Sequence, residues 1–453
     1  MATMLSLSAS YNLKESFELQ SLWLLIFATY LSFMLVFYYL FSASDLPFLT
    51  SLFVLFNFLF FFLTPLSVIS SNSIWFVNRL SSQHEKMQSM LILYFILIVS
   101  NIVIVVSSRK HPKVKATGTK PNSQISISRL NIIAKFYIIG LLGLIIFAPS
   151  ILLNLLPQNY SNPAIQNVAL SSAQFGLSRA LLQTTPVVLA ICFLRITRLP
   201  NNERFIRWGY FFSLLSFLFS LPLGSSRQMF LFSFIPIMLA IFESKNFIRQ
   251  ILITAIPLIA IFGQQFTFAI THSYGEIRKY GYGRFLQNMN FNVSEILLQG
   301  DFDSFGMFTL GLKSIENGLN LFPFTQFLGV FFFWVPRFIW NDKPFDTSIE
   351  IARFNNLSFQ NLSAPWVLEL LVNGGFILLV VGTVYLTLRI IKLDALLNFS
   401  DRSWIGNLLL AGSFFILLRG SLLQASGVVV YAFFLVIFLT RKKDFRKMDS
   451  KIL

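Results

Sequence analysis

Long apolar runs recur along this chain and are separated by short polar segments. A bilayer core needs roughly 20 apolar residues per helix, and backbone inside a membrane must satisfy its own hydrogen bonds, so each run is expected to be a helix. The runs predict spans at residues 20–42, 47–71, 88–108, 131–156, 176–194, 208–223, 228–242, 251–269, 366–388, 403–420 and 421–440. The pattern therefore predicts an all-α, polytopic membrane protein with about 11 (10–12) transmembrane helices.

One long polar stretch divides the chain into three parts. Residues 1–269 are predicted to form an N-terminal membrane bundle of about eight spans, and residues 366–453 about three further spans with a basic tail. Residues 270–365 between them form a large extracytoplasmic loop, which is long enough to be functional unless it is disordered. Its many aromatic and aliphatic residues predict order, with one or two short helices at 288–320 and irregular chain from Trp340 to Pro365.

Composition agrees with a membrane protein. Of 453 residues, 55% are hydrophobic and 12% are charged, whereas a soluble chain carries about 25% charged residues. The single cysteine, Cys192, lies in an apolar run, and the three histidines are far apart in the sequence. We therefore expect no metal site and no cofactor.

The net charge of +16 is explained by topology. Basic residues dominate 109–129, 195–207 and 441–453, while 243–250 and 389–402 are each +1. With eleven spans, all five segments fall on one side, which the positive-inside rule makes the cytoplasm. The C-terminus is then cytoplasmic, the long loop faces the exterior, and a nucleic-acid partner is not expected.

Three arginines lie within or at the edge of apolar runs: Arg179, Arg227 and Arg419. The predicted topology places all three at the outer face. That face also carries Arg278, Arg284, Arg337 and Arg353 in the long loop. Such arginines can anchor helix ends by snorkelling, or they can bind a polyanion, because guanidinium groups bind phosphate oxygens bidentately. Both interpretations stay open on the residues alone.

Sequence motifs favour the second interpretation. Leu221–Met229 reads Leu-Pro-Leu-Gly-Ser-Ser-Arg-Gln-Met, and Trp334–Pro344 reads Trp-Val-Pro-Arg-Phe-Ile-Trp-Asn-Asp-Lys-Pro. These segments resemble the Gly/Ser-Arg turn and the Pro-Arg-x-x-Trp-x-x-Lys-Pro element of the bacterial O-antigen polymerase family (Wzy-type oligosaccharide repeat-unit polymerases). Residues 369–375, Glu-Leu-Leu-Val-Asn-Gly-Gly, resemble its Glu…Asn-Phe-Gly pattern, with Gly374 in place of the aromatic residue. The Arg419-Gly420 step also fits.

The resemblance implies an activity and its partners. Such enzymes join undecaprenyl-diphosphate-linked oligosaccharides at the outer face of the bacterial cytoplasmic (inner) membrane, in O-antigen, capsule or exopolysaccharide synthesis, without metal or nucleotide. The implied partners are these lipid-linked oligosaccharides, the lipid bilayer and a chain-length regulator protein. Donor and acceptor both carry diphosphates, so arginines at the outer mouth are expected.

The candidate site residues fall into two groups. The predicted diphosphate-binding residues are Arg179, Arg227, Arg278, Arg284, Arg337, Lys343 and Arg419. The candidate general bases are Asp303, Glu369 and His272, with Asp301 and Glu276 also open. A base must reach the acceptor hydroxyl, and the sequence gives no distances that would choose among them.

Three other functions are weighed against the polymerase. A lipid-linked oligosaccharide flippase or other polysaccharide transporter also needs cationic residues, but deep in a central cavity and with short loops on both faces. An O-antigen ligase uses related chemistry with a different acceptor. A membrane acyltransferase is expected to show a catalytic histidine with an acidic partner. The long outer loop argues against the transporter.

Overall fold

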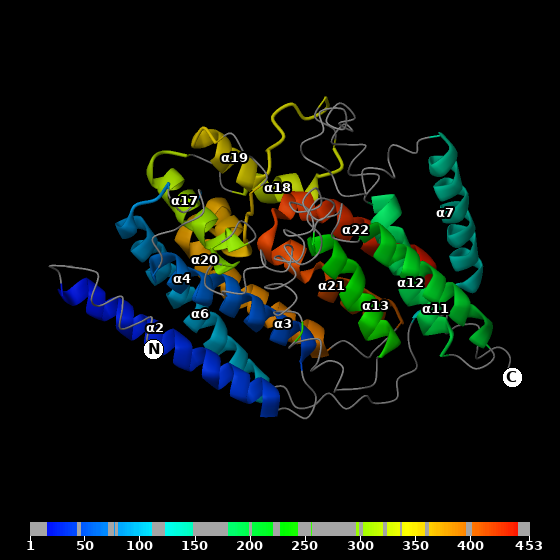
Figure 1. Ribbon diagram of the computed structural model, residues 1–453, viewed down its shortest axis with the longest axis horizontal. Helices are drawn as coiled ribbons and strands as arrows, with labels where there is room; N and C mark the ends of the chain where they lie inside the picture. Colours follow the sequence, from blue (N-terminus) through cyan, green and yellow to red (C-terminus); the bar gives the residue numbers. More distant parts are fainter. Residues whose placement is uncertain are drawn as a thin grey trace, which may run out of the picture.

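The chain is helical throughout most of the part that its structure describes (Figure 1). This is a computed structural model. It describes residues 16–42, 47–70, 77, 80–110, 123–147, 180–198, 202–220, 227–242, 255, 296–298, 302–319, 324–335, 338–357, 362–395 and 401–442. Its only strands in these ranges are β1 (Ser123–Ile125) and β2 (Thr440–Lys442), which pair antiparallel.

The described helices of the N-terminal part are apolar, and several of them are long. They are α2 (Ser16–Ser42), α3 (Phe48–Asn57), α4 (Thr64–Ser70), α6 (Gln83–Lys110), α7 (Ile127–Phe147), α11 (Thr185–Ile196), α12 (Ile206–Ser220) and α13 (Arg227–Ile241). A π-helical segment, η1 (Phe58–Leu63), joins α3 to α4, and another, η2 (Ala180–Thr184), leads into α11. A 3-10 turn, η3 (Glu203–Phe205), precedes α12.

Among the described residues, three short helices precede the C-terminal ones. They are α17 (Ser304–Glu316), α18 (Thr325–Phe331) and α19 (Thr347–Phe354). The long helices that follow are α20 (Trp366–Ala395), α21 (Asp401–Arg419) and α22 (Leu422–Leu439). In Figure 1, α17, α18 and α19 lie together at one end of the long helices.

The predicted class of helical membrane protein agrees with these helices. Five of the described helical segments are long and apolar enough to cross a membrane: Ser21–Ser42, Phe48–Ile69, Gln83–Ser107, Ile127–Phe147 and Trp366–Asp394. Every other predicted span overlaps a shorter helix, except 251–269, which lies outside the described residues apart from residue 255. The count of eleven spans stays a prediction.

The described part of the long loop agrees with its prediction in one segment and differs from it in another. A helix within 288–320 is present as α17. The expectation of irregular chain from Trp340 to Pro365 is wrong in its middle, where residues 347–354 form α19. This short helix buries Thr347, Ser348, Ile351 and Ala352 against its neighbours, so tertiary packing stabilises a helix too short to be stable alone.

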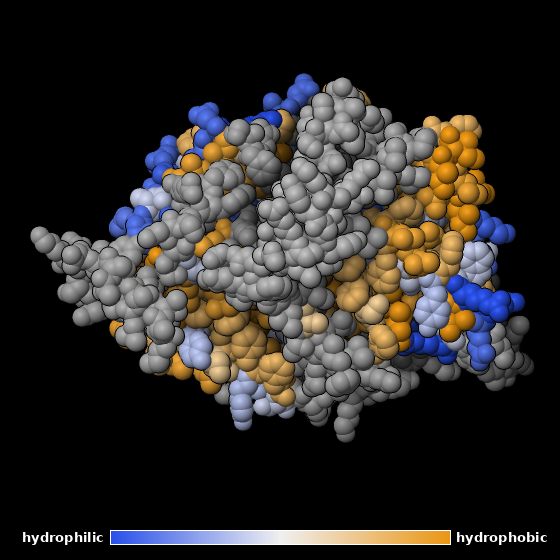
Figure 2. Space-filling view, viewed as in Figure 1, coloured by the Kyte–Doolittle hydropathy of each residue, from blue (hydrophilic) through white to orange (hydrophobic). Residues whose placement is uncertain are grey.

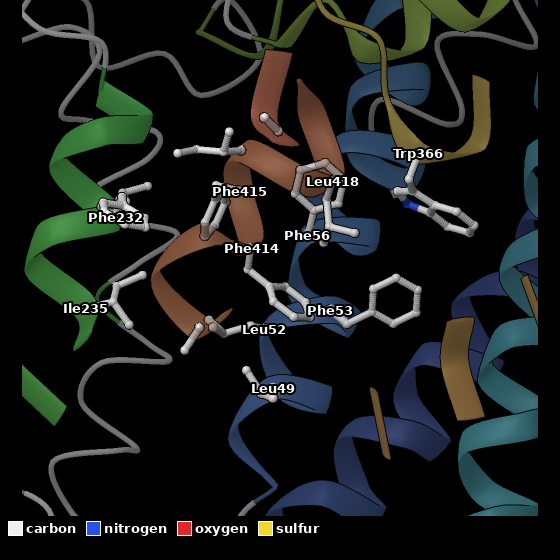
Figure 3. Packing of buried hydrophobic residues seen from close by; sticks show 14 of the residues in the cluster. Leu49, Leu52, Phe53, Phe56, Phe232, Ile235, Trp366, Phe414, Phe415 and Leu418 are labelled. Atoms are coloured by element: carbon white, nitrogen blue, oxygen red, sulfur yellow. The ribbon is translucent and has the colours of Figure 1, made fainter. Parts of the chain in front are cut away.

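The core lies where α3, α13, α20 and α21 meet (Figure 3). All ten residues of α3 are buried, and in Figure 3 its Phe53 and Phe56 lie between Trp366 of α20 and Phe414 and Phe415 of α21. The rings of Phe53 and Trp366 have centroids 5.6 Å apart, and those of Phe56 and Phe415 are 5.9 Å apart. Interlocked aromatic rings of this kind supply dispersion contacts, which drive helix association in lipid.

A small residue sets the closest approach of α13 and α21. A Cβ atom at Gly412 of α21 would lie 2.6 Å from the carbonyl oxygen of Phe232 and 2.8 Å from Cδ of Pro236. Pro236 lies inside α13. Small residues let membrane helices pack backbone against backbone, and Gly412 performs this function here.

The helix ends form two opposite faces of the molecule, and polar contacts connect different elements at each face. At one end, Lys313 of α17 forms a 3.2 Å ion pair with Glu85 at the start of α6. At the other end, the Asp394 carboxylate accepts hydrogen bonds from the backbone N–H groups of Leu49 and Thr50, at 2.8 and 2.7 Å. We call the end that carries α17, α18 and α19 the loop face and the other the opposite face.

The two faces group the segments as the predicted topology does. On the opposite face, β1 from the basic segment 109–129 pairs with β2 at the start of the basic tail 441–453, with Gln124 opposite Arg441. Arg198 there donates to the carbonyl oxygen of Ala240. Figure 2 shows apolar surface along the long helices, with hydrophilic residues at the upper left, over α17 and α19, and at the lower right. Which face is cytoplasmic stays a prediction.

Candidate functional site

The structure describes four of the ten predicted site residues with their side chains: Asp303, Lys343, Glu369 and Arg419. Arg227 is the first residue of α13, but its side chain is not among those described. The remaining five lie outside the described residues: Arg179, His272, Arg278, Arg284 and Arg337. The four described residues all lie on the loop face, and three of them, Asp303, Glu369 and Arg419, lie at the turn between α21 and α22.

Asp303 and Arg419 form an ion pair. Asp303 directly precedes α17, and Arg419 is the last residue of α21. Nη2 of Arg419 lies 3.1 Å from Oδ1 of Asp303, and the side chains are 18% and 2% exposed. A buried carboxylate is costly unless it is paired and hydrogen-bonded. The guanidinium of Arg419 meets that need while part of its own side chain stays exposed.

The chain segment before α20 reinforces this ion pair. The backbone N–H of Ser363 donates to Oδ2 of Asp303 at 3.0 Å, and the N–H of Ala364 donates to the carbonyl oxygen of Arg419 at 3.1 Å. Two consecutive residues, Ser363 and Ala364, therefore bind both members of the pair. The arrangement fixes the end of α21 to the start of α17, although the two residues lie 116 positions apart.

Glu369 connects α20 to two other helices, α19 and α22. Its Oε2 accepts a 2.8 Å hydrogen bond from the hydroxyl of Thr347 at the start of α19. Its Oε1 accepts from the backbone N–H of Leu422, the first residue of α22, at 3.1 Å. The first N–H groups of a helix have no acceptor within that helix, and a negative charge there is favourable. The carboxylate of Glu369, which is 2% exposed, supplies this acceptor from α20.

Helix α20 is broken just after this point. Gly374 (φ −161°, ψ 23°) and Gly375 (φ 63°, ψ −160°) depart from helical geometry. The conformation of Gly375 is essentially restricted to glycine. The break releases the carbonyl oxygen of Asn373, which accepts a 2.9 Å hydrogen bond from the N–H of Phe324, while Oδ1 of Asn373 accepts from the N–H of Phe327 at 3.1 Å. The start of α18 is thus hydrogen-bonded to Asn373, directly before the break in α20.

Lys343 holds a turn of the loop. Its Nζ donates to the carbonyl oxygens of Phe333 and Val335, at 2.6 and 2.8 Å. Lys343, from the Lys-Pro pair of the motif, therefore binds the backbone just before Arg337. This contact gives Lys343 a structural role in the Trp334–Pro344 segment, and its predicted contact with a diphosphate stays a prediction.

We refer to Asp303, Asp346, Thr347, Glu369, Asn373, Arg419 and Ser421 as the loop-face network. Ser421 joins it by donating from its hydroxyl to Oδ1 of Asp346 at 3.2 Å. Arg419 and Leu422 border the α21–α22 turn, so this turn is bound by Asp303 on one side and by Glu369 on the other. Almost every connection in the network links parts of the chain far apart in sequence.

The geometry bears on the two described candidate bases. Both oxygens of Asp303 and both oxygens of Glu369 already accept a hydrogen bond from the protein. Each oxygen keeps a second lone pair, but both side chains are buried, which leaves little room for an acceptor hydroxyl to approach either carboxylate. The arrangement favours positioning roles for both, while His272 lies outside the described residues.

Several polar residues of this region were not predicted. Three of them lie at helix starts, where small polar residues are common: Asp346, Thr347 and Ser421. The sequence could have indicated them only by their position at a predicted helix end. Two buried hydroxyls flank Asp303, those of Ser304 and Ser363, and neither has a hydrogen-bond partner among the described residues. Among the described side chains, no group of three His, Cys, Asp or Glu residues could hold a metal ion.

Comparison of the chain with models of known protein families, with curated proteins and with solved structures found no match. The fold and the loop-face network are therefore interpreted from their own chemistry and from the motifs in the sequence.

Proposed function

We propose that the protein is a polymerase that joins polyprenyl-diphosphate-linked oligosaccharide repeat units at the outer face of a bacterial inner membrane. The observation that carries the proposal is the position of Arg419. It lies at the end of a membrane helix, at the face where the long loop packs, and is held by a buried carboxylate while part of it stays exposed. A cation held in this way suits a substrate whose lipid is in the membrane and whose diphosphate is at its surface.

The proposed reaction is a glycosyl transfer. The bond between the anomeric carbon of the growing chain and its diphosphate oxygen breaks, and a bond forms between that carbon and a hydroxyl oxygen of the next lipid-linked unit. The hydroxyl proton passes to a base, and polyprenyl diphosphate leaves with the bonding electron pair. Negative charge grows on the leaving diphosphate, so fixed cations stabilise the transition state more than the ground state.

The arginines are assigned by position and motif. Arg227 and Arg337 lie in the two segments that resemble the polymerase family and are proposed to contact the lipid diphosphates. The residues proposed to assist them are Arg179, Arg278, Arg284, Arg419 and Lys343. Asp303 lies beside Arg419, and Glu369 holds the turn that follows it, so these two acidic residues support the cationic site.

Gene deletion tests this proposal against the main alternative. A strain that lacks a polymerase still transfers single repeat units to its surface acceptor lipid but loses the long-chain ladder. A strain that lacks a flippase loses the single-unit product as well, because no unit reaches the outer face. We expect the first pattern on a gel of the extracted polysaccharide. The second pattern would replace the polymerase by the transporter, and loss of all transfer with long lipid-linked polymer retained would indicate the ligase.

A further inference from the structure

An exposed apolar surface lies on α18 and on the chain that follows it. Six large apolar side chains there are each at least 45% exposed: Leu328, Phe331, Phe332, Trp334, Phe338 and Ile339. We call these six residues the α18 patch. Residues 317–336 contain no Asp, Glu, Lys or Arg. An exposed apolar patch of this size marks a surface that contacts lipid or another protein.

The patch occupies one side of α18, and another side of the same helix packs on the protein. Leu328 and Phe331 are three residues apart, so they share a helix face. A Cβ atom at Gly329 would lie 2.7 Å from Cγ of Pro344 and 3.6 Å from Cδ1 of Leu423 in α22. The helix is therefore held in place by close packing, and its exposed side is fixed in direction.

The patch begins beside the exposed apolar surface of α20. The N–H of Phe324, which directly precedes α18, donates to the carbonyl oxygen of Asn373. Phe376 and Ile377 follow Asn373 within about one helical turn, and both are exposed. They belong to the segment Trp366–Asp394, which is long and apolar enough to cross a membrane. Exposed apolar side chains on such a segment are expected to face lipid, so the α18 patch starts where a lipid-facing surface starts.

The contact with α22 gives a depth for the patch. A Cβ atom at Gly427 would lie 3.9 Å from the ring of Phe333, and Gly427 lies about 7.5 Å along α22 from its first residue. This helix coincides with the predicted span 421–440. Its 18 residues are about 27 Å long, slightly less than the roughly 30 Å of a bilayer core. If α22 crosses the membrane, it needs its whole length, and Phe333 then lies at the hydrocarbon boundary or below it.

The element is suited to lie along a membrane surface and is too short to cross one. Helix α18 has seven residues and is about 10 Å long. Irregular backbone at membrane depth needs hydrogen bonds from the protein. Here Nζ of Lys343 donates to the carbonyl oxygens of Phe333 and Val335, and the N–H of Val335 donates to the carbonyl oxygen of Phe332 at 3.0 Å. Trp334 lies between these residues, and Trp is enriched at membrane–water interfaces.

We propose that the α18 patch lies in the lipid leaflet on the loop face and contacts its acyl chains, so that this part of the long loop is an interfacial membrane anchor. The proposed occupant is bilayer phospholipid, because the patch is uncharged and adjoins the surfaces by which α20 and α22 are expected to face lipid. The inference goes beyond the proposed function and does not depend on it. It also gives the Trp334–Pro344 segment a location, because Lys343 connects that segment to the anchor.

The test measures the depth of the patch, with full-length protein in liposomes of phosphatidylethanolamine and phosphatidylglycerol. A nitroxide label is attached at Phe331→Cys and, in a second variant, at Phe338→Cys. Electron paramagnetic resonance measures the collision rates of the label with oxygen, which concentrates in hydrocarbon, and with a water-soluble nickel chelate. Ile377→Cys on α20, where Ile377 is 79% exposed, is the lipid control, and Asn317→Cys after α17 is the water control. Every variant carries Cys192→Ser, so each has a single thiol.

We expect the ratio of oxygen to nickel collision rates to be several-fold higher at Phe331 and Phe338 than at Asn317, and close to the ratio at Ile377. A ratio at the level of Asn317 at either patch position would show that it faces water and would overturn the inference.

Three other occupants of the patch would also contradict the inference. Low collision rates with both reagents would mean that protein covers the patch, and spectral broadening by a nearby label would identify that protein as a second copy of the chain. An oxygen collision rate at Phe331 that falls when polyprenyl diphosphate is added to the liposomes would assign the patch to the lipid of a substrate.

Two substitutes keep the test decisive. If Phe331→Cys does not accumulate in the membrane, Leu328→Cys replaces it, because the two residues share a helix face. Trp334→Cys replaces Phe338→Cys in the same way. Failure of the proposed function is seen separately, because a protein that forms no polymer from lipid-linked repeats would still show the lipid ratio at the patch.

Discussion

Glu369 shows how one buried carboxylate can organise the ends of several helices. It accepts from the start of α19 through Thr347 and from the start of α22 through Leu422. Asn373, one turn later, donates from its Nδ2 to the carbonyl oxygen of Glu369 at 2.8 Å and accepts from α18. Glu369 and Asn373 thus connect α20 to α18, α19 and α22.

Replacement of Glu369 should separate its structural role from a catalytic one. Glu369→Ala leaves the N–H of Leu422 and the hydroxyl of Thr347 without their acceptor, and each buried unsatisfied group costs about 1–3 kcal/mol. Glu369→Gln keeps one oxygen and should cost less. We expect Tm in detergent to fall in the order wild type, Gln, Ala, with activity following Tm. A Gln variant with wild-type Tm and no activity would instead identify Glu369 as the base.

The motif arginines give a second prediction. Arg→Lys keeps the charge but loses the planar fork that binds two phosphate oxygens. If Arg227 and Arg337 stabilise the departing diphosphate, Arg227→Lys and Arg337→Lys should each cost about 2.7–4 kcal/mol, or roughly 100- to 1,000-fold in rate. The measurement is polymer length on gels at matched protein levels. Wild-type polymer in both variants would show that these arginines only anchor helix ends.

The helices differ in how directly the sequence indicates them. Spans such as 20–42 and 47–71 were predicted almost to the residue, because a long apolar run has few other stable conformations in a membrane. The short α19 was missed because Thr347–Phe354 is amphipathic and brief, and its burial depends on neighbours that no local pattern reveals. The ion pair of Asp303 with Arg419 joins residues 116 positions apart, so the sequence could name both residues but not their contact.

The contact between α13 and α21 gives a prediction about packing. Gly412→Ala places a methyl group within 3 Å of backbone and of Pro236, which are not free to move. We expect the free energy of unfolding to fall by about 1–3 kcal/mol, as in other overpacked cores. Gly140→Ala in α7 is the control, because nothing lies within 4 Å of its Cβ position. Thermal unfolding of the purified variants compares the two, and equal Tm values would contradict the packing described for α13 and α21.

The arrangement of the two faces can be tested on the intact chain. Arg204 and Asn317 are both exposed, on the opposite face and the loop face respectively. We expect Arg204→Cys and Asn317→Cys to react with a membrane-impermeant thiol reagent from opposite sides, Asn317→Cys from outside. The native Cys192 is buried and should give little background. Labelling of both positions from outside intact cells would contradict the topology.

The molecule joins a set of apolar helices to a loop that packs on their ends, and the loop-face network lies where the two meet. The proposed function requires the exposed part of Arg419 to lie at the level of a lipid diphosphate. The arginine is connected to Asp303, just before α17, and to Ala364, just before α20. This arrangement is compatible with the proposed substrate, which has a lipid part and a sugar part.

Reconstitution tests the proposed function most directly. The purified full-length protein, in liposomes and with polyprenyl-diphosphate-linked repeat units as its only substrate, should form a ladder of longer chains and release one polyprenyl diphosphate for each new glycosidic bond. No nucleotide should be required, because the diphosphate leaving group supplies the driving force. Transport of the lipid-linked unit across the bilayer without any new glycosidic bond would contradict the polymerase and identify a transporter.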